Sequence, residues 1–236
     1  MQDISRLIVR REDVRTLLFS CPLTLEELKR QRCNATLSYV AWGAQQRTRS
    51  KGKHTIGGVP LPKAPTVKNH TPAWFCVTPH EPGSFIVPRL IRERFFFADN
   101  PDGISETDMF FHGYVKEQPR AVSALLNCTF SYLLLEIIGR QGIEGRFNIY
   151  SPELAQVVIL DPSLLGDGGV RTLVKSFEVL GSRPVQKILD EIHQPDRRAL
   201  DDVVFDVLGL TAGEREAVYE AVVELVRARL EKARSV

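Results

Sequence analysis

The middle of the chain carries a helical pattern of apolar residues. Between Pro119 and Gly139, apolar side chains recur at three- and four-residue spacing, as on a helix that faces a core. Pro119 suits the first helical position, where its missing N–H has no partner to lose, and Gly139 suits a left-handed C-terminal cap. The pattern predicts one long packed helix over 119–139, with the polar pair Asn127-Cys128 inside it. Its apolar positions are Val122, Leu125, Leu126, Phe130, Leu133, Leu134 and Ile137.

Strand signals lie on both sides of this helix. After it, a polar, glycine-bearing loop leads to a strand at 147–150, a short helix from Ser151-Pro152 and an extended run at 157–160. Closely spaced strands separated by tight turns precede it, and they predict a curved antiparallel sheet. These upstream strand signals cover 74–77, 85–87, 94–98 and 108–115. The fold class predicted is α+β, with a β-rich domain around the long helix.

The two ends of the chain have simpler patterns. Residues 4–9 indicate a short strand, and helical spacing follows at 12–19 and at 34–43. Beyond a glycine turn at 166–169, helical patterns cover 170–180, 184–192, 197–208 and, after the Thr211–Glu214 capping box, 212–233. We expect this stretch to be a helical C-terminal appendage without chemistry. Its acidic pair Asp201-Asp202 is expected on a solvated helix face.

The order of these elements resembles the target-recognition module of TaqI-like adenine-specific DNA methyltransferases. ALLNCTFSYLLLEIIGR, a glycine loop and FNIYSPELAQVVILDP carry the likeness, which the strands from PAWFCV to TDMFFHG and the tail from RALDDVVFD onward extend over nearly the whole chain. The resemblance implies a connector at 1–27 of the kind that follows a catalytic domain. It implies a DNA target-recognition domain at 28–165 and a helical C-terminal region at 170–236.

The net charge of +2 hides a strongly basic interval. No Asp or Glu lies between Glu27 and Glu81, whereas nine Lys and Arg residues do. Part of this interval, 45–72, is irregular and interrupted by Pro and Gly, and its basic half has the composition of a loop that neutralises phosphates. Composition alone favours a solvated, flexible loop, whereas the family resemblance favours DNA contact. The candidate phosphate ligands are Arg47, Arg49, Lys51, Lys53 and Lys68.

Three arginines elsewhere are further candidates for DNA contact. Arg89 and Arg92 follow the predicted strand at 85–87. A guanidinium can bind guanine O6 and N7 together or grip a phosphate. Surface ion pairs with Glu93 or Asp99 are an equal alternative. Arg140 flanks the glycine loop, within expected reach of a phosphate.

Trp74 and Asn127 each have two interpretations. Trp74 can stack on a base, although core packing is favoured for a large aromatic side chain. Asn127 can read adenine through its amide, although a hydrogen bond to a buried backbone group is favoured. We include Trp74 among the candidate DNA-binding residues.

The chain carries no local signature of catalysis. An adenine methyltransferase needs a glycine-rich turn for S-adenosylmethionine and an Asn/Asp-Pro-Pro-Tyr/Phe motif that holds the flipped base. The sequence has neither, and Asn100-Pro101 continues into Asp102-Gly103 as a turn. It also lacks a recognisable nuclease or hydrolase motif. We therefore expect no catalytic residue and no cofactor on this chain, with S-adenosylmethionine bound by a catalytic partner.

Cysteine usage and hydropathy complete the sequence-based expectations. The four cysteines are scattered without a C-x-x-C pair, which predicts reduced thiols. A zinc site around Cys76 and His80 is disfavoured because a second tight ligand pair is missing. No apolar run approaches the ~20 residues that span a bilayer, and the first residues are too charged for a secretory signal. We expect a cytoplasmic protein without a membrane partner.

These observations lead to one principal hypothesis. The chain is expected to supply sequence-specific recognition of double-stranded DNA, as a specificity subunit or fragment, to a catalytic methyltransferase partner of a restriction–modification system. The alternative is a non-catalytic assembly protein that docks partner subunits through its helical tail. An enzyme with an unrecognised active site ranks third.

Overall fold

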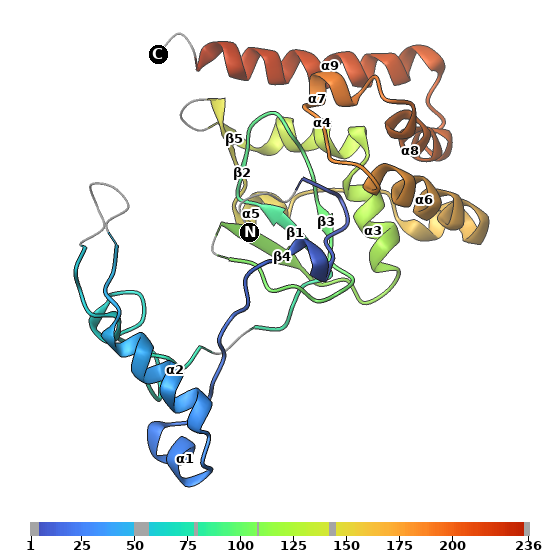
Figure 1. Ribbon diagram of the computed structural model, residues 1–236. Helices are drawn as coiled ribbons and strands as arrows, with labels where there is room; N and C mark the ends of the chain where they lie inside the picture. The colour runs from blue at the N-terminus through green and yellow to red at the C-terminus, as the bar shows by residue number, and fades with distance from the viewer. Residues whose placement is uncertain (1–4, 50–56, 78–79, 108, 142–144, 234–236) are drawn as a thin grey trace. The chain divides into compact units, whose positions relative to one another are not determined.

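The computed structural model describes residues 5–49, 57–77, 80–107, 109–141 and 145–233, and its contacts divide the chain into two compact units (Figure 1). Unit 1 comprises Met1–Arg15 and Pro82–Val236, and unit 2 comprises Thr16–Glu81. This division differs from the boundaries expected at 27/28 and 165/170. The helices after 166 belong to the same unit as the strands, and the residues expected as a connector are shared between both units.

Unit 2 is built around a short helix followed by a longer one. Helix α1 (Leu25–Arg30) begins at a capping box in which Thr24 Oγ1 accepts from the Glu27 N–H and the Glu27 carboxylate accepts from the Thr24 N–H. Helix α2 (Asn34–Gln45) confirms the helix predicted at 34–43. A 3₁₀ turn, η2 (Leu61–Lys63), follows later. The buried core of unit 2 consists of Cys21, Leu28, Val40, Phe75 and Cys76.

Unit 1 contains two small antiparallel sheets that meet at Arg89. In the first, β1 (Phe85–Pro88) lies between β3 (Ala98–Asp99) and β4 (Phe110–Gly113). In the second, β6 (Phe147–Asn148) lies between β2 (Leu90–Ile91) and β5 (Arg140–Gln141). Arg89 separates β1 from β2. The Arg89 N–H donates to the Met109 carbonyl and its carbonyl accepts from the Ile149 N–H, so the chain passes directly from one sheet to the other.

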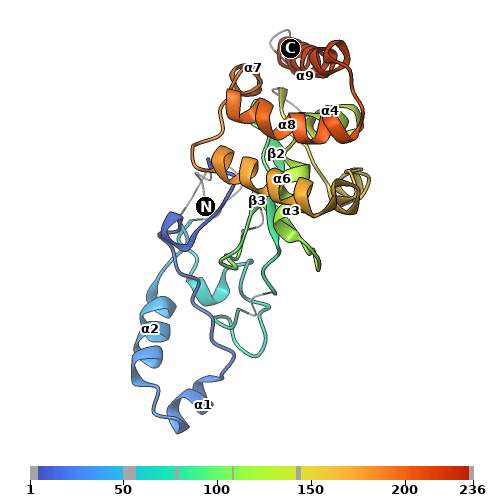
Figure 2. The same cartoon turned by 90° about the vertical axis from the view of Figure 1, so that its right-hand side faces the viewer.

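Helices supply most of the remainder of unit 1, which confirms a mixed α+β class with small antiparallel sheets. Helix α9 packs along α4, and α6 contacts both α3 and α8 (Figures 1 and 2). The helices are α3 (Pro119–Leu126), α4 (Thr129–Ile138), α5 (Ser151–Leu154), α6 (Gly166–Gly181), α7 (Ile188–Glu191), α8 (Pro195–Val207) and α9 (Ala212–Lys232), with 3₁₀ turns η1 (Arg11–Asp13) and η4 (Pro162–Leu165).

The long helix predicted at 119–139 is two helices with a break at Asn127-Cys128. The axes of α3 and α4 differ by 65°. The Asn127 side chain is fully buried and bonds the backbone of Phe97 in both directions. Oδ1 accepts from the Phe97 N–H (2.9 Å), and Nδ2 donates to the Phe97 carbonyl (2.7 Å). Apolar positions continue through the break because α3 buries Ala121, Ala124 and Leu125 in one cluster and α4 buries Tyr132 and Leu135 in another, so the pattern did not reveal the bend.

No single helix in the described part of the chain is long and apolar enough to cross a membrane. Together, α3 and α4 have the length and composition, but they are bent at their junction.

Gly139 ends α4 for a reason other than the one expected. Its φ of −79° and ψ of 161° are extended, not left-handed. A Cβ at this position would collide with the ring of Phe147, which is buried on β6. The glycine is therefore required by the close approach of β6 to the end of α4.

A buried ion pair and buried hydrogen bonds of two arginines attach the C-terminal helices to the rest of unit 1. Arg197 on α8 is fully buried, pairs with Glu191 at 3.2 Å and donates to the Asn127 carbonyl at the α3–α4 break. Arg229 on α9 pairs with Glu136 on α4 at 2.5 Å and donates to the carbonyl of Arg92 (2.8 Å). The tail thus shares the polar interior of the unit, whereas the sequence indicated an appendage.

Several of the predicted elements are not formed. Among the described residues of the strand predicted at 4–9, Arg6 and Ile8 make only isolated bridges. Residues 74–77 take a turn in which Phe75 and Cys76 fill the unit 2 core. The run at 157–160 pairs with no strand among the described residues; it packs Ile159 against helices while Val158 stays exposed. The helix predicted at 12–19 is limited to η1. In each case tertiary contacts decide which apolar residues are buried and which are exposed, and local periodicity does not show these contacts.

Replacing Gly139 with Ala should destabilise the protein by ~1–3 kcal/mol, because the new methyl overpacks against the buried Phe147 ring. Gly168 is the matched control: it lies on α6, is exposed, and a Cβ there meets nothing within 4 Å. Gly168→Ala should be neutral or stabilising by up to about 1 kcal/mol. Urea denaturation measures both, and equal stability of the two variants would contradict the close-approach explanation.

Replacing Glu191 with Ala should cost ~3–5 kcal/mol, since Arg197 would remain buried without its carboxylate. Glu216→Ala removes an exposed partner of Arg198 instead and should cost less than about 1 kcal/mol. The denaturation midpoints of both variants test whether the tail is integral to unit 1. A tail that behaves as a separate appendage would show two transitions, with Glu191→Ala affecting only one.

Candidate nucleic-acid interface

The basic stretch after α2 begins as an ordered arm. Arg47 bridges Pro60 in antiparallel fashion, the Thr48 N–H donates to the Val59 carbonyl (2.8 Å), and the Gly58 N–H donates to the Thr48 carbonyl (2.8 Å). The Arg47 guanidinium donates to the carbonyl of Gly58 (2.6 Å) and remains exposed. The first part of the predicted irregular loop therefore has a defined, strand-like backbone.

The other candidates of unit 2 differ in exposure. Arg49 and Lys68 are exposed, and the Lys68 N–H donates to the Ala64 carbonyl in a turn (2.9 Å). Lys51 and Lys53 lie outside the described residues. Trp74 is half-buried: a Cβ on Gly43 would lie 3.0 Å from its indole, and its ring meets Phe75 edge-on. Its observed contacts are those of the core-packing interpretation.

The three arginine candidates of unit 1 lie on or beside its second sheet. Arg140 is on β5, which pairs with β6, whereas Arg89 and Arg92 flank β2 on the other side of β6. The Arg89 guanidinium carbon lies 4.6 Å from the centre of the Phe111 ring, a cation–π contact. Arg92 is exposed, and its carbonyl accepts from Arg229. The candidates therefore form two groups, one in each unit.

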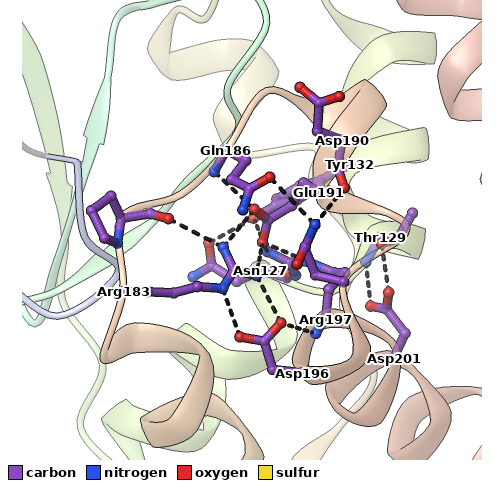
Figure 3. Close-up of polar contacts among 12 residues, drawn as sticks. Asn127, Thr129, Tyr132, Arg183, Gln186, Asp190, Glu191, Asp196, Arg197 and Asp201 are labelled. Atoms are coloured by element: carbon purple, nitrogen blue, oxygen red, sulfur yellow. Dashed lines mark hydrogen bonds and ion pairs between the residues drawn. The ribbon is translucent and has the colours of Figure 1, made fainter.

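A cluster of buried titratable groups lies beside the α3–α4 break (Figure 3). Asp201, predicted on a solvated face, is fully buried; its carboxylate accepts from the Thr129 N–H (2.7 Å), the Thr129 hydroxyl (2.6 Å) and the Tyr219 hydroxyl (3.1 Å). The prediction was wrong because the amphipathic pattern of α8 does not show which polar residue meets a buried donor. Loss of hydration raises the pKa of Asp201, against the lowering effect of Arg197 and these donors.

This cluster is a structural network. Asn127, Arg197 and Asp201 are all fully buried, and each makes several hydrogen bonds inside the protein. The backbone contacts of Asn127 are those of its structural interpretation. A substrate would have to displace these bonds to reach any of the three, so perturbed pKa values here report burial.

Neither unit by itself holds a metal-ligand grouping among its described residues. The His112 ring and the Glu106 carboxylate are within hydrogen-bond distance in unit 1. In the part of the chain that the structure describes, no third His, Cys, Asp or Glu side chain of the same unit joins such a pair at ligand distance.

The exposed face of α2 was not among the predicted candidates. Tyr39 and Trp42 on this helix are 50% and 54% exposed, although large aromatic side chains mostly bury. The signal was present in the sequence, since no charged residue occurs from Cys33 to Gln46 in an otherwise basic region.

Comparison with known proteins gives no relative for this chain: no family model, curated protein or solved structure matches it.

Cys128 should be inert in the folded protein. Burial raises the pKa of its thiol to about 11, so near pH 8 almost none of the reactive thiolate is present. Cys33 is half-buried and provides the internal control. Alkylation followed by mass spectrometry should label Cys33 well before Cys128, and denaturation should abolish the difference. Rapid labelling of Cys128 in the native protein would contradict the buried network.

Proposed function

We propose that this chain is a sequence-specific duplex-DNA recognition module of an adenine-specific methyltransferase or restriction–modification system, with catalysis and S-adenosylmethionine on a partner. The motif resemblance at 117–162 motivates the family. The observation that carries DNA binding is the basic interval of unit 2, in which exposed Arg47 and Arg49 extend from an ordered arm. The positive electrostatic potential of such a basic interval attracts a polyanion.

In this proposal the two groups of candidates have different tasks. The unit 2 residues Arg47, Arg49 and Lys68, with Lys51 and Lys53, neutralise phosphates and release counterions, which supplies sequence-independent affinity. Arg89 and Arg92, which flank β2 of unit 1, read base edges. The Phe111 ring contacts the Arg89 guanidinium, and this contact restricts its side-chain freedom before a bidentate bond forms. Arg140 on β5 adds a phosphate contact.

The proposal also includes the specific fold of unit 1. We take the two small sheets and the broken helix α3–α4 as the curved target-recognition fold of the resembled family. The short strands reach from β1 through Arg89 into β2, which gives the bend that such a fold needs.

Replacing Arg47, Arg49, Lys51 and Lys53 together with Ala should weaken binding to every duplex by a similar factor, because phosphates carry no base identity. The slope of log K against log salt should fall by about 0.9 for each phosphate that the variant no longer neutralises. Fluorescence anisotropy with labelled duplexes over a salt series measures both quantities.

A matched control removes four positive charges from the helical tail: Arg171, Lys175, Arg227 and Lys232, all exposed, each to Ala. This variant should keep the parental salt slope. If the arm variant binds as the parent does and the tail variant does not, the tail is the binding surface. If the parent binds no duplex, alone or with a methyltransferase, the proposed function is wrong.

A further inference from the structure

Helix α2 presents an exposed face without a single charge. The buried side of the helix carries Val40 and Gly43, which face the unit 2 core. The solvent side carries only small, amide, hydroxyl or aromatic side chains. These exposed residues are Asn34, Ala35, Ser38, Tyr39, Ala41, Trp42, Ala44 and Gln45. Surface helices of globular proteins ordinarily place charged residues on this side.

The aromatic residues on this face form a fixed row. Tyr39 and Trp42 stack with ring centroids 5.4 Å apart, and Phe19 packs on Tyr39 at 4.9 Å. Each ring contacts the next in this row, yet Tyr39 and Trp42 are half exposed. The small residues beside them let another surface approach the helix backbone closely.

Positive charge flanks this face at both ends of the helix. Lys29, Arg30 and Arg32 precede α2, and Arg47 and Arg49 follow it; all five are exposed. With no acid between Glu27 and Glu81, these charges favour a polyanion over a protein as the partner. If this polyanion is a nucleic acid, the uncharged face of α2 would contact the groups that lie between its phosphates.

The arrangement of α1 and α2 suits the groove of a duplex. The two helices are joined by three residues, Gln31 to Cys33, and pack through the core that contains Leu28 and Val40. In DNA-binding helix-turn-helix proteins, two helices joined by such a short turn place the second one in the major groove, which is ~12 Å wide and admits one helix. Twelve residues make α2 about 18 Å long, enough to span several base pairs.

We propose that α2 is a recognition helix that lies in the major groove of duplex DNA, an inference that rests on the proposed function. The amides of Asn34 and Gln45 can bond adenine N6 and N7, and Ala41 and Trp42 can contact thymine methyl groups. The flanking basic residues bind the phosphates on either side of the groove. The main base-reading element is then α2, in addition to the arginines of unit 1.

The test begins with selection of preferred sequences from a library of randomised duplexes by the full-length chain. Ala41→Glu, which adds a negative charge to the proposed face, should weaken binding to the selected duplex at least about tenfold. Ala217→Glu is the matched control, since it adds the same charge at an exposed position on α9, and its affinity should stay within about twofold.

Neutral variants separate base reading from charge. Gln45→Ala and Trp42→Ala should weaken binding to the selected duplex about 5- to 100-fold and binding to a scrambled duplex far less. Far-ultraviolet circular dichroism confirms folding, and Gln45 is exposed, so at least this variant keeps the fold.

Each other outcome contradicts the inference in a recognisable way. If the parent binds duplex DNA and the α2 variants bind equally well, α2 does not read bases, while the proposed function stands. If the parent self-associates and Ala41→Glu abolishes only that association, the face is a protein interface. If the selection yields no preferred sequence, base reading by this chain is wrong. If the parent binds neither duplex, the proposed function fails first.

Discussion

The side chain of Asn127 makes the contacts on which unit 1 depends. Its Oδ1 accepts from the Phe97 N–H and the Tyr132 hydroxyl, and its Nδ2 donates to the carbonyls of Phe97 and Ser123. The backbone carbonyl of the same residue accepts from Arg197. One fully buried residue, through its side chain and its backbone carbonyl, therefore joins the strand region, both halves of the broken helix and α8. An apolar residue here would leave several buried polar groups unpaired, each at a cost of ~1–3 kcal/mol.

Two residues of the segment that carries the family resemblance have structural roles beside the break that Asn127 stabilises. Gly139 admits the Phe147 ring at the end of α4, and Glu136 on the same helix holds Arg229 of α9. These residues fix helices and strands to one another, and none is presented to solvent for ligand contact.

The elements that were predicted correctly from the sequence are those that nearby residues determine. Periodicity predicted helices α2, α6, α8 and α9, and the Thr211–Glu214 capping box marked the start of α9. The features that were not predicted depend on contacts between residues that are distant in the sequence. The burial of Asp201 depends on Thr129, 72 residues away, and no property of α8 alone encodes that contact. Arg47 and Arg49 of the candidate site are exposed, and their contact with DNA stays a prediction. The uncharged face of α2 was not predicted, because periodicity alone does not show which aromatic side chains of a helix stay exposed.

The pairing of charges distinguishes the two units. In unit 1, Arg183, Arg197 and Arg229 each lie against a carboxylate, so these cations contribute little external field. In unit 2 the stretch between Glu27 and Glu81 offers its Lys and Arg residues no carboxylate of its own. Salt screens exposed charges much more than buried pairs. Rising ionic strength should therefore weaken anion binding by unit 2 at concentrations that leave the ion pairs of unit 1 intact, which separates the charges that maintain the fold from those available to a ligand.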